Sequence, residues 1–317
     1  MTCARLQITR AGPHCTIQDG GRAGFLRWGI PASGPMDRKA LAIANAALGN
    51  PPGAAGIEVG PGGLDLELAG APLTLAVAGG GFLVQVDGSP RPAWAVLRLD
   101  PGQRLTIRPG PWGSWACVAV GGRILAPGWL GSLATHGPSG LGGGRLAAGS
   151  VVEVAGHDPA PGPDRAIPCP VWARPRRRLM AVAGPQDRFF APEALAALAG
   201  QPFRLTAAWD RMGLRLSGPP LPPQGALGVP SEPVLRGSVQ VSGDGVATVL
   251  LADHQTTGGY PKIATLLADD VDGLVQNRPG DAVTFALVPP QAAVQTARLR
   301  AAVLAAFLPR LSPATRR

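Results

Sequence analysis

The residues best suited to chemistry lie in one short segment in the last third of the chain. This segment, residues 250–264, reads LLADHQTTGGYPKIA and follows an apolar stretch that predicts a buried strand. The backbone N–H groups of its TTGG turn can point toward an anion, and Lys262 can add a positive charge beside them. His254, with a reference pKa of about 6.5, can exchange protons at neutral pH. The segment therefore predicts an anion site with a proton-transfer group, although a bent loop with a buried histidine is the structural alternative.

Four other polar clusters could contribute to the same site. GPQD at residues 184–187 follows a predicted strand over 179–183, and WDRMGLRL occupies residues 209–216. TIQDGGR at residues 16–22 and GIPASGPMD at residues 29–37 precede a predicted helix. Each cluster also has a structural interpretation as a turn or a helix cap, and adjacent Asp210 and Arg211 would point apart on a strand.

The elements that must position these clusters are mainly strands. The chain has 317 residues, of which 45% are apolar, and this composition excludes an open disordered coil. Its 45 glycines and 35 prolines are spread without a collagen period, so short apolar runs alternate with many turns. This pattern favours a mainly β sandwich or barrel with few helices. LELAGAPL and LRLSGPPL, 148 positions apart, suggest two similar β domains in tandem, with chance similarity as the alternative.

Two domains and a linker are predicted. Residues 1–155 form the first domain, with an initial strand at 5–10, a helix near 36–49 and β structure over 57–154, in which 73–86 is a buried pair of strands. The proline- and arginine-rich residues 156–178 form a linker or crossover. The RPRRR run within them is predicted to be a solvated linker, with a nucleic-acid patch as the alternative. Residues 179–317 form the second domain, with a short helix at 192–199 and a C-terminal helix at 291–308.

The formal charge of +9 suggests an anionic partner, but the basic run is not interleaved with aromatic residues, so neither nucleic acid nor a membrane is expected.

No phosphate-binding GxxxxGK[ST] loop occurs, so ATP chemistry is expected on a partner subunit. Neither lysine has the Met-Lys-Met context of a biotin acceptor, so no covalently bound cofactor is expected. The four cysteines lack metal-ligand spacing, so no metal site is predicted, and the N-terminus lacks an apolar export signal, so the cytoplasm is the expected location.

Taken together, TIQDGGR, GIPASGPMD, GPQD, DRMGLRL and LLADHQTTGGYPKIA resemble the biotin-dependent carboxyltransferase family that contains the C-type component of 5-oxoprolinase, also called KipA or allophanate hydrolase subunit 2. The resemblance extends in order from about residue 5 to residue 288. It implies two tandem cyclophilin-like β-barrel domains. It also implies two partner proteins, a smaller B-type or KipI-like one and an A-type one, which together with this chain open 5-oxoproline (pyroglutamate) to glutamate at the expense of ATP.

The first hypothesis is therefore a subunit of a 5-oxoprolinase-type amidohydrolase that acts on a small amide or carboxylate substrate and is inactive without its partners. Lys262 and the TTGG turn would hold the anion, His254 would relay a proton, and Tyr260 or Gln186 would donate to the carbonyl. The candidate catalytic residues are His254, Lys262, Tyr260 and Gln186. The candidate substrate-binding residues are Gln255, Thr256, Thr257, Gly258, Gly259, Asp187, Asp210, Arg211, Gln18, Asp19 and Asp37. The alternatives are carboxyl transfer to urea or an amide, which needs a biotinylated partner, and a KipA-like regulatory binding protein.

Overall fold

The computed structural model describes residues 4–156, 164–225 and 229–312, which form two compact units. The first unit comprises the described parts of Met1–Arg22, Ser33–Arg174 and Leu304–Arg317, and the second comprises those of Ala23–Ala32 and Pro175–Val303. The sequence predicts one domain over residues 179–317, whereas the last residues join the first unit. Two contacts explain this: the Phe307 ring packs edge-on against Trp172, and the Arg165 guanidinium donates to the Leu311 carbonyl at 2.8 Å.

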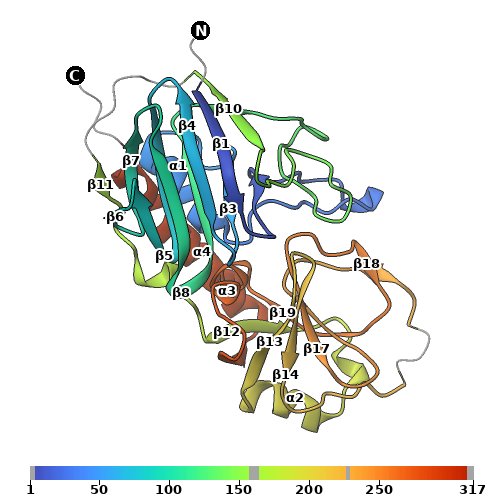
Figure 1. The fold of residues 1–317 in the computed structure, drawn as a ribbon. Helices are drawn as coiled ribbons and strands as arrows, with labels where there is room; N and C mark the ends of the chain where they lie inside the picture. Colours follow the sequence, from blue (N-terminus) through green and yellow to red (C-terminus); the bar gives the residue numbers. More distant parts are fainter. Residues whose placement is uncertain (1–3, 157–163, 226–228, 313–317) are drawn as a thin grey trace. The chain divides into compact units, whose positions relative to one another are not determined.

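The first unit is an eleven-stranded sheet in which β11-β7-β5-β8-β4-β1-β10-β9 lie in order, with β2, β3 and β6 paired beside this path (Figure 1). Inward positions alternate along β1, where Leu6 and Ile8 are buried and their neighbours are exposed, as expected for a sheet with one face on the core. The strands are β1 Ala4–Ala11, β2 Thr16–Gln18, β3 Gly56–Val59, β4 Leu64–Gly70, β5 Leu73–Val86, β6 Ser89–Arg91, β7 Ala95–Leu99, β8 Arg104–Val120, β9 Arg123–Leu125, β10 Val151–Ala155 and β11 Arg165–Ala166.

Strand β5 corrects one prediction, because residues 73–86 form a single 14-residue strand rather than a pair of strands. Its three consecutive glycines bend the strand and leave it paired with β8 on both sides of the bend, where the register shifts. Gly79 has a φ of 124°, and a Cβ on Gly81 would lie 2.3 Å from Trp112 Nε1. The glycines therefore allow a close approach of two strands instead of a reversal.

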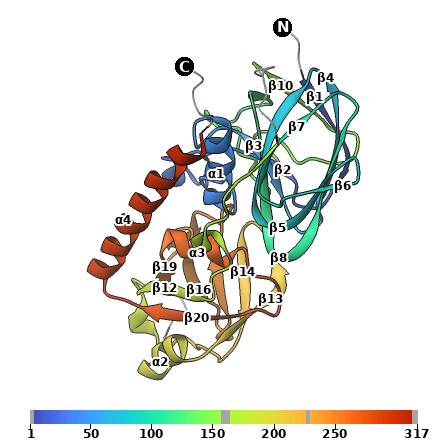
Figure 2. The ribbon, with the colours of Figure 1, turned by 90° about the vertical axis from the view of Figure 1, so that its left-hand side faces the viewer.

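Helix α1, Arg38–Leu48, agrees with the helix predicted near 36–49 and packs on β5 and β8 (Figure 2). Asp37 is its N-cap, with the carboxylate accepting from the Ala40 N–H at 3.0 Å. Gly49 ends the helix in the left-handed conformation, with φ of 77°.

The second unit contains a closed barrel of seven strands in the order β12-β19-β16-β17-β14-β13-β20. The prediction of a mainly β fold is confirmed. The strands of the second unit close into a barrel, whereas the described strands of the first unit form the eleven-stranded sheet. The barrel strands are β12 Arg178–Ala183, β13 Phe203–Trp209, β14 Gly213–Ser217, β16 Ser238–Val241, β17 Ala247–Leu250, β19 Lys262–Leu266 and β20 Ala282–Leu287, and β15 Glu232–Pro233 pairs with β18 Thr257–Gly258 beside it. The remaining elements of the two units together are the helices α2 Pro192–Gly200, α3 Ala268–Leu274 and α4 Pro290–Phe307 and the 3-10 turns η1 Leu26–Trp28, η2 Val171–Ala173, η3 Asp187–Phe189 and η4 Leu308–Leu311.

Part of the predicted linker forms regular secondary structure. Residues 157–163 lie outside the described residues, but β11 pairs with β7 in the first unit's sheet. The RPRRR run is not a uniformly solvated linker, because Arg176 forms an ion pair of 2.9 Å with the buried carboxylate of Asp270 and Arg178 begins β12. Arg177, with its side chain 75% exposed, fits the prediction.

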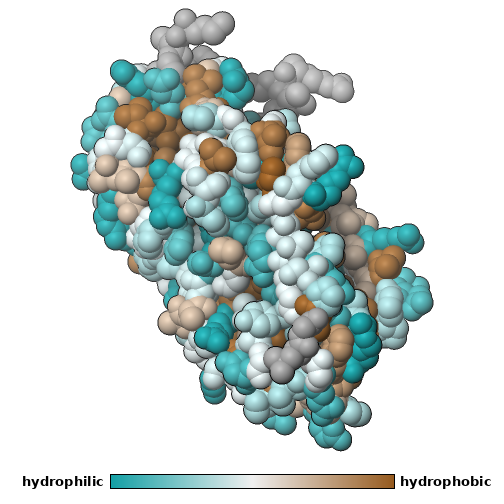
Figure 3. All heavy atoms as spheres, turned by 90° about the vertical axis from the view of Figure 1, so that its right-hand side faces the viewer, coloured by the Kyte–Doolittle hydropathy of each residue, from teal (hydrophilic) through white to brown (hydrophobic). Residues whose placement is uncertain are grey.

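On the surface shown in Figure 3, apolar side chains form small groups among polar ones. Within the described ranges, no helix is both long and apolar enough to cross a membrane.

Candidate functional site

The second unit carries a cavity of about 600 Å³ on its barrel. This volume lies within the range of about 300–1,000 Å³ typical of small-molecule sites. Three of the predicted site residues line it: Asp210, from the turn between β13 and β14, and Gln255 and Tyr260, from the loop after β17. The other lining residues are Ala208, Trp209, Met212, Gly213, Arg215, Gln240, Ser242, Thr248 and Leu250. The cavity therefore combines two aromatic rings with carboxamide, hydroxyl, carboxylate and guanidinium groups.

Two carboxamides form the polar centre of this lining. Gln255 Nε2 donates to Gln240 Oε1 at 3.0 Å, and Gln240 Nε2 lies 3.4 Å from the Tyr260 carbonyl, to which it donates. A Cβ on Gly258 would lie 2.5 Å from Gln240 Nε2, so the glycine leaves room for the amide. Gln240 is 4% exposed and extends from the fully buried strand β16. It holds the loop in which the sequence predicts the site.

A second network joins Gln186, Glu232 and Lys262. Gln186 Oε1 accepts from the Lys262 backbone N–H at 2.9 Å, while Gln186 Nε2 donates to Glu232 Oε2 at 2.7 Å. The Lys262 ammonium, on a side chain only 3% exposed, lies 3.4 Å from the same Glu232 oxygen. The structure thus brings two predicted catalytic residues together but gives the ammonium a carboxylate of the protein itself, so a ligand anion would share Lys262 with Glu232 or replace it.

The turn predicted to bind an anion is partly a strand. Thr257 and Gly258 pair with Pro233 and Glu232 in the short β15–β18 ladder, and the Thr256 carbonyl accepts from the Val234 N–H at 3.0 Å. Gly259, which follows this ladder, is exposed.

His254 is buried beside the cavity-lining loop, 4% exposed, and is not among the residues that line the cavity. Its Nδ1 lies 2.5 Å from the Gln255 carbonyl oxygen, which can only accept, so Nδ1 carries the proton in the neutral ring. Burial lowers the pKa of His254 below its usual value of 6.5, against the opposing effect of this hydrogen bond. The ring is therefore neutral at pH 7, and its proton-relay role stays a prediction.

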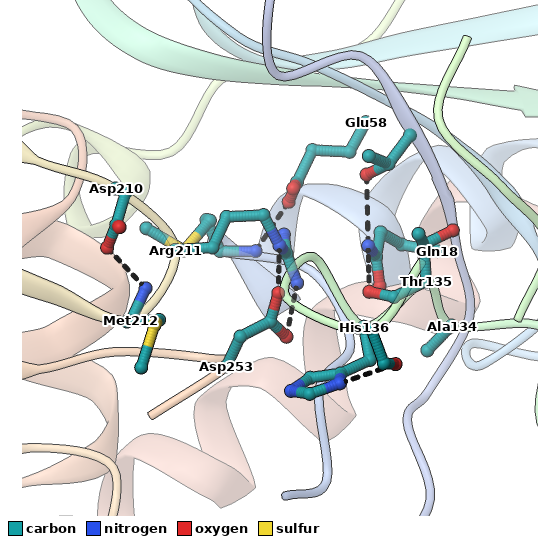
Figure 4. Close-up of polar contacts among 12 residues, drawn as sticks. Gln18, Glu58, Ala134, Thr135, His136, Asp210, Arg211, Met212 and Asp253 are labelled. Carbon is teal, nitrogen blue, oxygen red and sulfur yellow. Dashed lines mark hydrogen bonds and ion pairs between the residues drawn. The ribbon is translucent and has the colours of Figure 1, made fainter. Parts of the chain in front are cut away.

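Arg211 and Asp253 form a buried ion pair with two contacts, Nε to Oδ2 at 2.8 Å and a terminal nitrogen to Oδ1 at 3.2 Å (Figure 4). The Asp253 N–H also donates to the Arg211 carbonyl at 2.8 Å. Asp210 turns the other way, as Figure 4 shows, and its Oδ1 accepts from the Met212 N–H at 2.7 Å. Asp210 and Arg211 thus lie in a turn, where Asp210 shapes the cavity rim and Arg211 fixes the loop. Asp187, in η3, is half-buried and is not among the lining residues.

The remaining predicted residues belong to the first unit, and each has a contact within that unit. Gln18 is buried, and its Nε2 donates to Thr16 Oγ1 at 2.9 Å and to the Thr135 carbonyl at 3.0 Å. Asp19 accepts from Ser132 Oγ and from the Leu133 N–H, each at 2.6 Å. Asp37 caps α1, as described above. These contacts give all three residues structural roles, and their part in substrate binding stays a prediction.

Two residues of these networks, Gln240 and Glu232, are absent from the site predicted from sequence. Glu232 lies 30 positions from Lys262, and its role depends on the β15–β18 ladder, which no local pattern indicates. Gln240 did carry a signal, since it is a long polar side chain between two valines, Val239 and Val241. Among the described residues, no group of three or more His, Cys, Asp and Glu side chains is placed to hold a metal ion.

The chain is similar to known proteins in both sequence and fold. The family model "Carboxyltransferase domain, subdomain A and B" matches residues 28–287. The chain is 34% identical to the C-type component of 5-oxoprolinase from Escherichia coli, over 88% of this chain and 90% of that protein. It is 30% identical to a putative urea carboxylase of Emericella nidulans, over 89% of this chain but 24% of that protein. The crystal structure of Kluyveromyces lactis urea carboxylase matches with a TM-score of 0.86 at 22% identity, over 99% of this chain and 30% of that one, and so shows the same fold.

Proposed function

The chain belongs to the carboxyltransferase-domain family, and from this we propose that it is the C-type subunit of a 5-oxoprolinase-type enzyme. The observation that carries the proposal is the similarity to the C-type protein of Escherichia coli, which extends over 90% of that protein. The proposed reaction is ATP-dependent hydrolysis of 5-oxoproline to glutamate. The cavity on the barrel is consistent with a small cyclic amide as the substrate, because its lining offers hydrogen-bond donors and acceptors beside aromatic side chains and its volume is large enough to hold one.

Opening a lactam requires three functions: an anion site for the substrate carboxylate, polarisation of the amide carbonyl, and proton delivery to the leaving nitrogen. We assign the carboxamide of Gln255, which Gln240 positions, and the side chain of Tyr260 to amide binding, because both side chains line the cavity. Lys262, with Glu232 as its resident partner, is the proposed anion site. His254 holds the loop backbone through its Nδ1 proton and remains the proposed proton relay.

The partners in this proposal are an A-type and a B-type protein, with ATP bound on a partner and the complex in the cytoplasm, where ATP is available. Biotin enters only with a biotinylated partner. No GxxxxGK[ST] phosphate loop is found in the sequence, which supports a division of labour between the partners.

The test is co-expression of this chain with the A-type and B-type proteins from the same genome, followed by an assay of glutamate release from 5-oxoproline with and without ATP. We expect ATP-dependent release that requires all three chains. Lys262→Met should reduce release at least tenfold, while Arg177→Met, which removes an exposed cation, should leave it unchanged. Full activity in Lys262→Met would remove Lys262 from the proposed anion site.

Carboxyl transfer is the second candidate, favoured by the 30% identity to the putative urea carboxylase. It needs a carboxybiotin donor, which a streptavidin blot of proteins that copurify with this chain would detect. A biotinylated partner together with no glutamate release would replace the hydrolase proposal with the transferase.

A further inference from the structure

We propose that Gln240 and Gln255 act as a carboxamide pair that recognises the cis-amide edge of a ligand, that is, the adjacent N–H and C=O of a lactam or ureido group. This inference rests on the proposed function and deepens it, since it names the chemical feature by which the cavity selects its ligand. Gln255 is the residue that contacts the ligand, and Gln240 is a positioning residue that acts through it.

Gln240 is fixed by its surroundings in a way that orients its amide. It is 4% exposed on β16, its Nε2 is directed at the Tyr260 carbonyl, and its Oε1 accepts from Gln255 Nε2. The absence of a side chain at Gly258 provides the space that Nε2 occupies. Because a carbonyl oxygen can only accept, Nε2 is the atom of Gln240 that faces the Tyr260 carbonyl, and Oε1 faces Gln255. Since Oε1 also only accepts, the atom of Gln255 in this contact is the donor Nε2.

The consequence for Gln255 follows from the number of its donors and acceptors. A carboxamide has two N–H donors and one oxygen with two acceptor sites. The contact with Gln240 uses one N–H, which leaves one N–H donor and the Oε1 acceptor on neighbouring atoms of a half-buried side chain that lines the cavity. A donor beside an acceptor matches the acceptor beside a donor of a cis amide. Two parallel hydrogen bonds form when Gln240 takes the N–H that points away from Oε1 and the ligand takes the N–H on the same side as Oε1.

This pairing distinguishes lactams and ureido groups from close analogues. A lactone has the ring and the carbonyl of a lactam but replaces the N–H by an oxygen, so it would place an acceptor against the Gln255 acceptor. A site that hydrogen-bonds an N–H rejects an analogue that lacks it, because the ligand then covers a polar group of the protein and leaves it unpaired. Trp209 and Tyr260 in the same lining provide the apolar surface for the ring itself.

The experiment compares two ligands that differ only at this position, 2-pyrrolidinone and γ-butyrolactone, by ligand-observed NMR titration of the full chain. We expect 2-pyrrolidinone to bind at least tenfold more tightly. Gln255→Leu should remove this preference, and Gln240→Leu should reduce it, whereas Gln295→Leu, at an exposed position of α4, should preserve it. Gln240→Glu should preserve it at about pH 5 and lose it at about pH 8, because only the protonated carboxyl both donates to the Tyr260 carbonyl and accepts from Gln255. This pH-dependent rescue separates positioning from general damage to the fold.

Equal affinities for the two ligands, no detectable binding of 2-pyrrolidinone, or an unchanged preference in Gln255→Leu would each overturn the inference. Glutamate release by the assembled enzyme is measured separately. Release without any lactam preference would overturn this inference and leave the proposed function in place. A lactam preference without release would support the inference and remove the hydrolase assignment.

Discussion

The buried pair of Arg211 and Asp253 gives the strongest stability prediction. Their side chains are 5% and 0% exposed, and the two charges meet through two contacts of 2.8 and 3.2 Å. Arg211→Met removes the guanidinium and leaves the Asp253 carboxylate without this counter-charge in a site that water does not reach. Breaking one partner of a buried ion pair costs about 3–5 kcal/mol. That loss is a large fraction of the total stability of about 5–15 kcal/mol of a typical domain.

Urea unfolding followed by circular dichroism measures this loss in the Arg211→Met, Asp253→Leu and double variants. We expect Arg211→Met to lower the free energy of unfolding by about 3–5 kcal/mol, and the double-mutant cycle with Asp253→Leu to give a coupling energy of about 0.5–3 kcal/mol, because the two side chains share the ion pair. A loss below about 1 kcal/mol in Arg211→Met would show that the pair is solvated. A coupling energy near zero would show that the two side chains stabilise the fold independently of each other.

Three further predictions concern single positions. Burial lowers the pKa of His254 in the folded chain, so the unfolded chain binds the proton first as the pH falls below about 6.5. The free energy of unfolding therefore decreases toward acid pH. His254→Asn, which keeps a donor near the Nδ1 position, should flatten this dependence in urea titrations between about pH 7.5 and 5.5. Gly184→Ala should destabilise the chain by at least about 2 kcal/mol in thermal unfolding, because the new Cβ would lie 2.0 Å from the Lys262 carbonyl oxygen, whereas Gly200→Ala in α2, with no atom within 4 Å, should be neutral or stabilising. Asp37→Ala should cost about 1 kcal/mol through loss of the α1 cap, and Asp37→Ser should recover most of it; equal stabilities of these two variants would contradict the capping argument.

The elements predicted correctly from sequence are those with local signals. The helix over residues 36–49 has a capping aspartate at one end and a glycine at the other, and both act as predicted. The short helix at 192–199 and the C-terminal helix at 291–308 were located to within one residue at each end. Their boundaries depend on neighbouring residues alone, so a single sequence is sufficient.

The three glycines of β5 show where local signals fail. A Gly-Gly-Gly run between apolar residues predicts a reversal as readily as a bend. The choice depends on Trp112 and on β8, which approach Gly81 closely from a later part of the chain. The same limit applies to the arginine run, since Arg176 gains its carboxylate partner from Asp270, 94 positions away.

For the candidate site, the residue types of the sequence pointed to a loop that lines the cavity, but they did not indicate the hydrogen-bond and ion-pair partners of its side chains. Gln255 and Tyr260 line the cavity, as a binding role requires. Lys262 looks like an uncommitted cation in the sequence, yet it is buried against Glu232 and linked to Gln186, 76 positions away. The chemical identity of a residue is visible in a sequence, whereas the partners that occupy its donors and acceptors are not.

Gln240 suggests how such a residue can still be found. All four positions of the strand SVQV are buried, including both faces of the strand, so a glutamine there must satisfy its amide without water. A long carboxamide buried in a strand therefore predicts a polar network within reach of its end, and the structure places that network at Gln255, Gly258 and Tyr260. An apolar side chain of similar size would pack on this strand without an amide that needs hydrogen-bond partners. Packing of the barrel therefore does not require a glutamine here, whereas the hydrogen bonds to the loop of Gln255 and Tyr260 do.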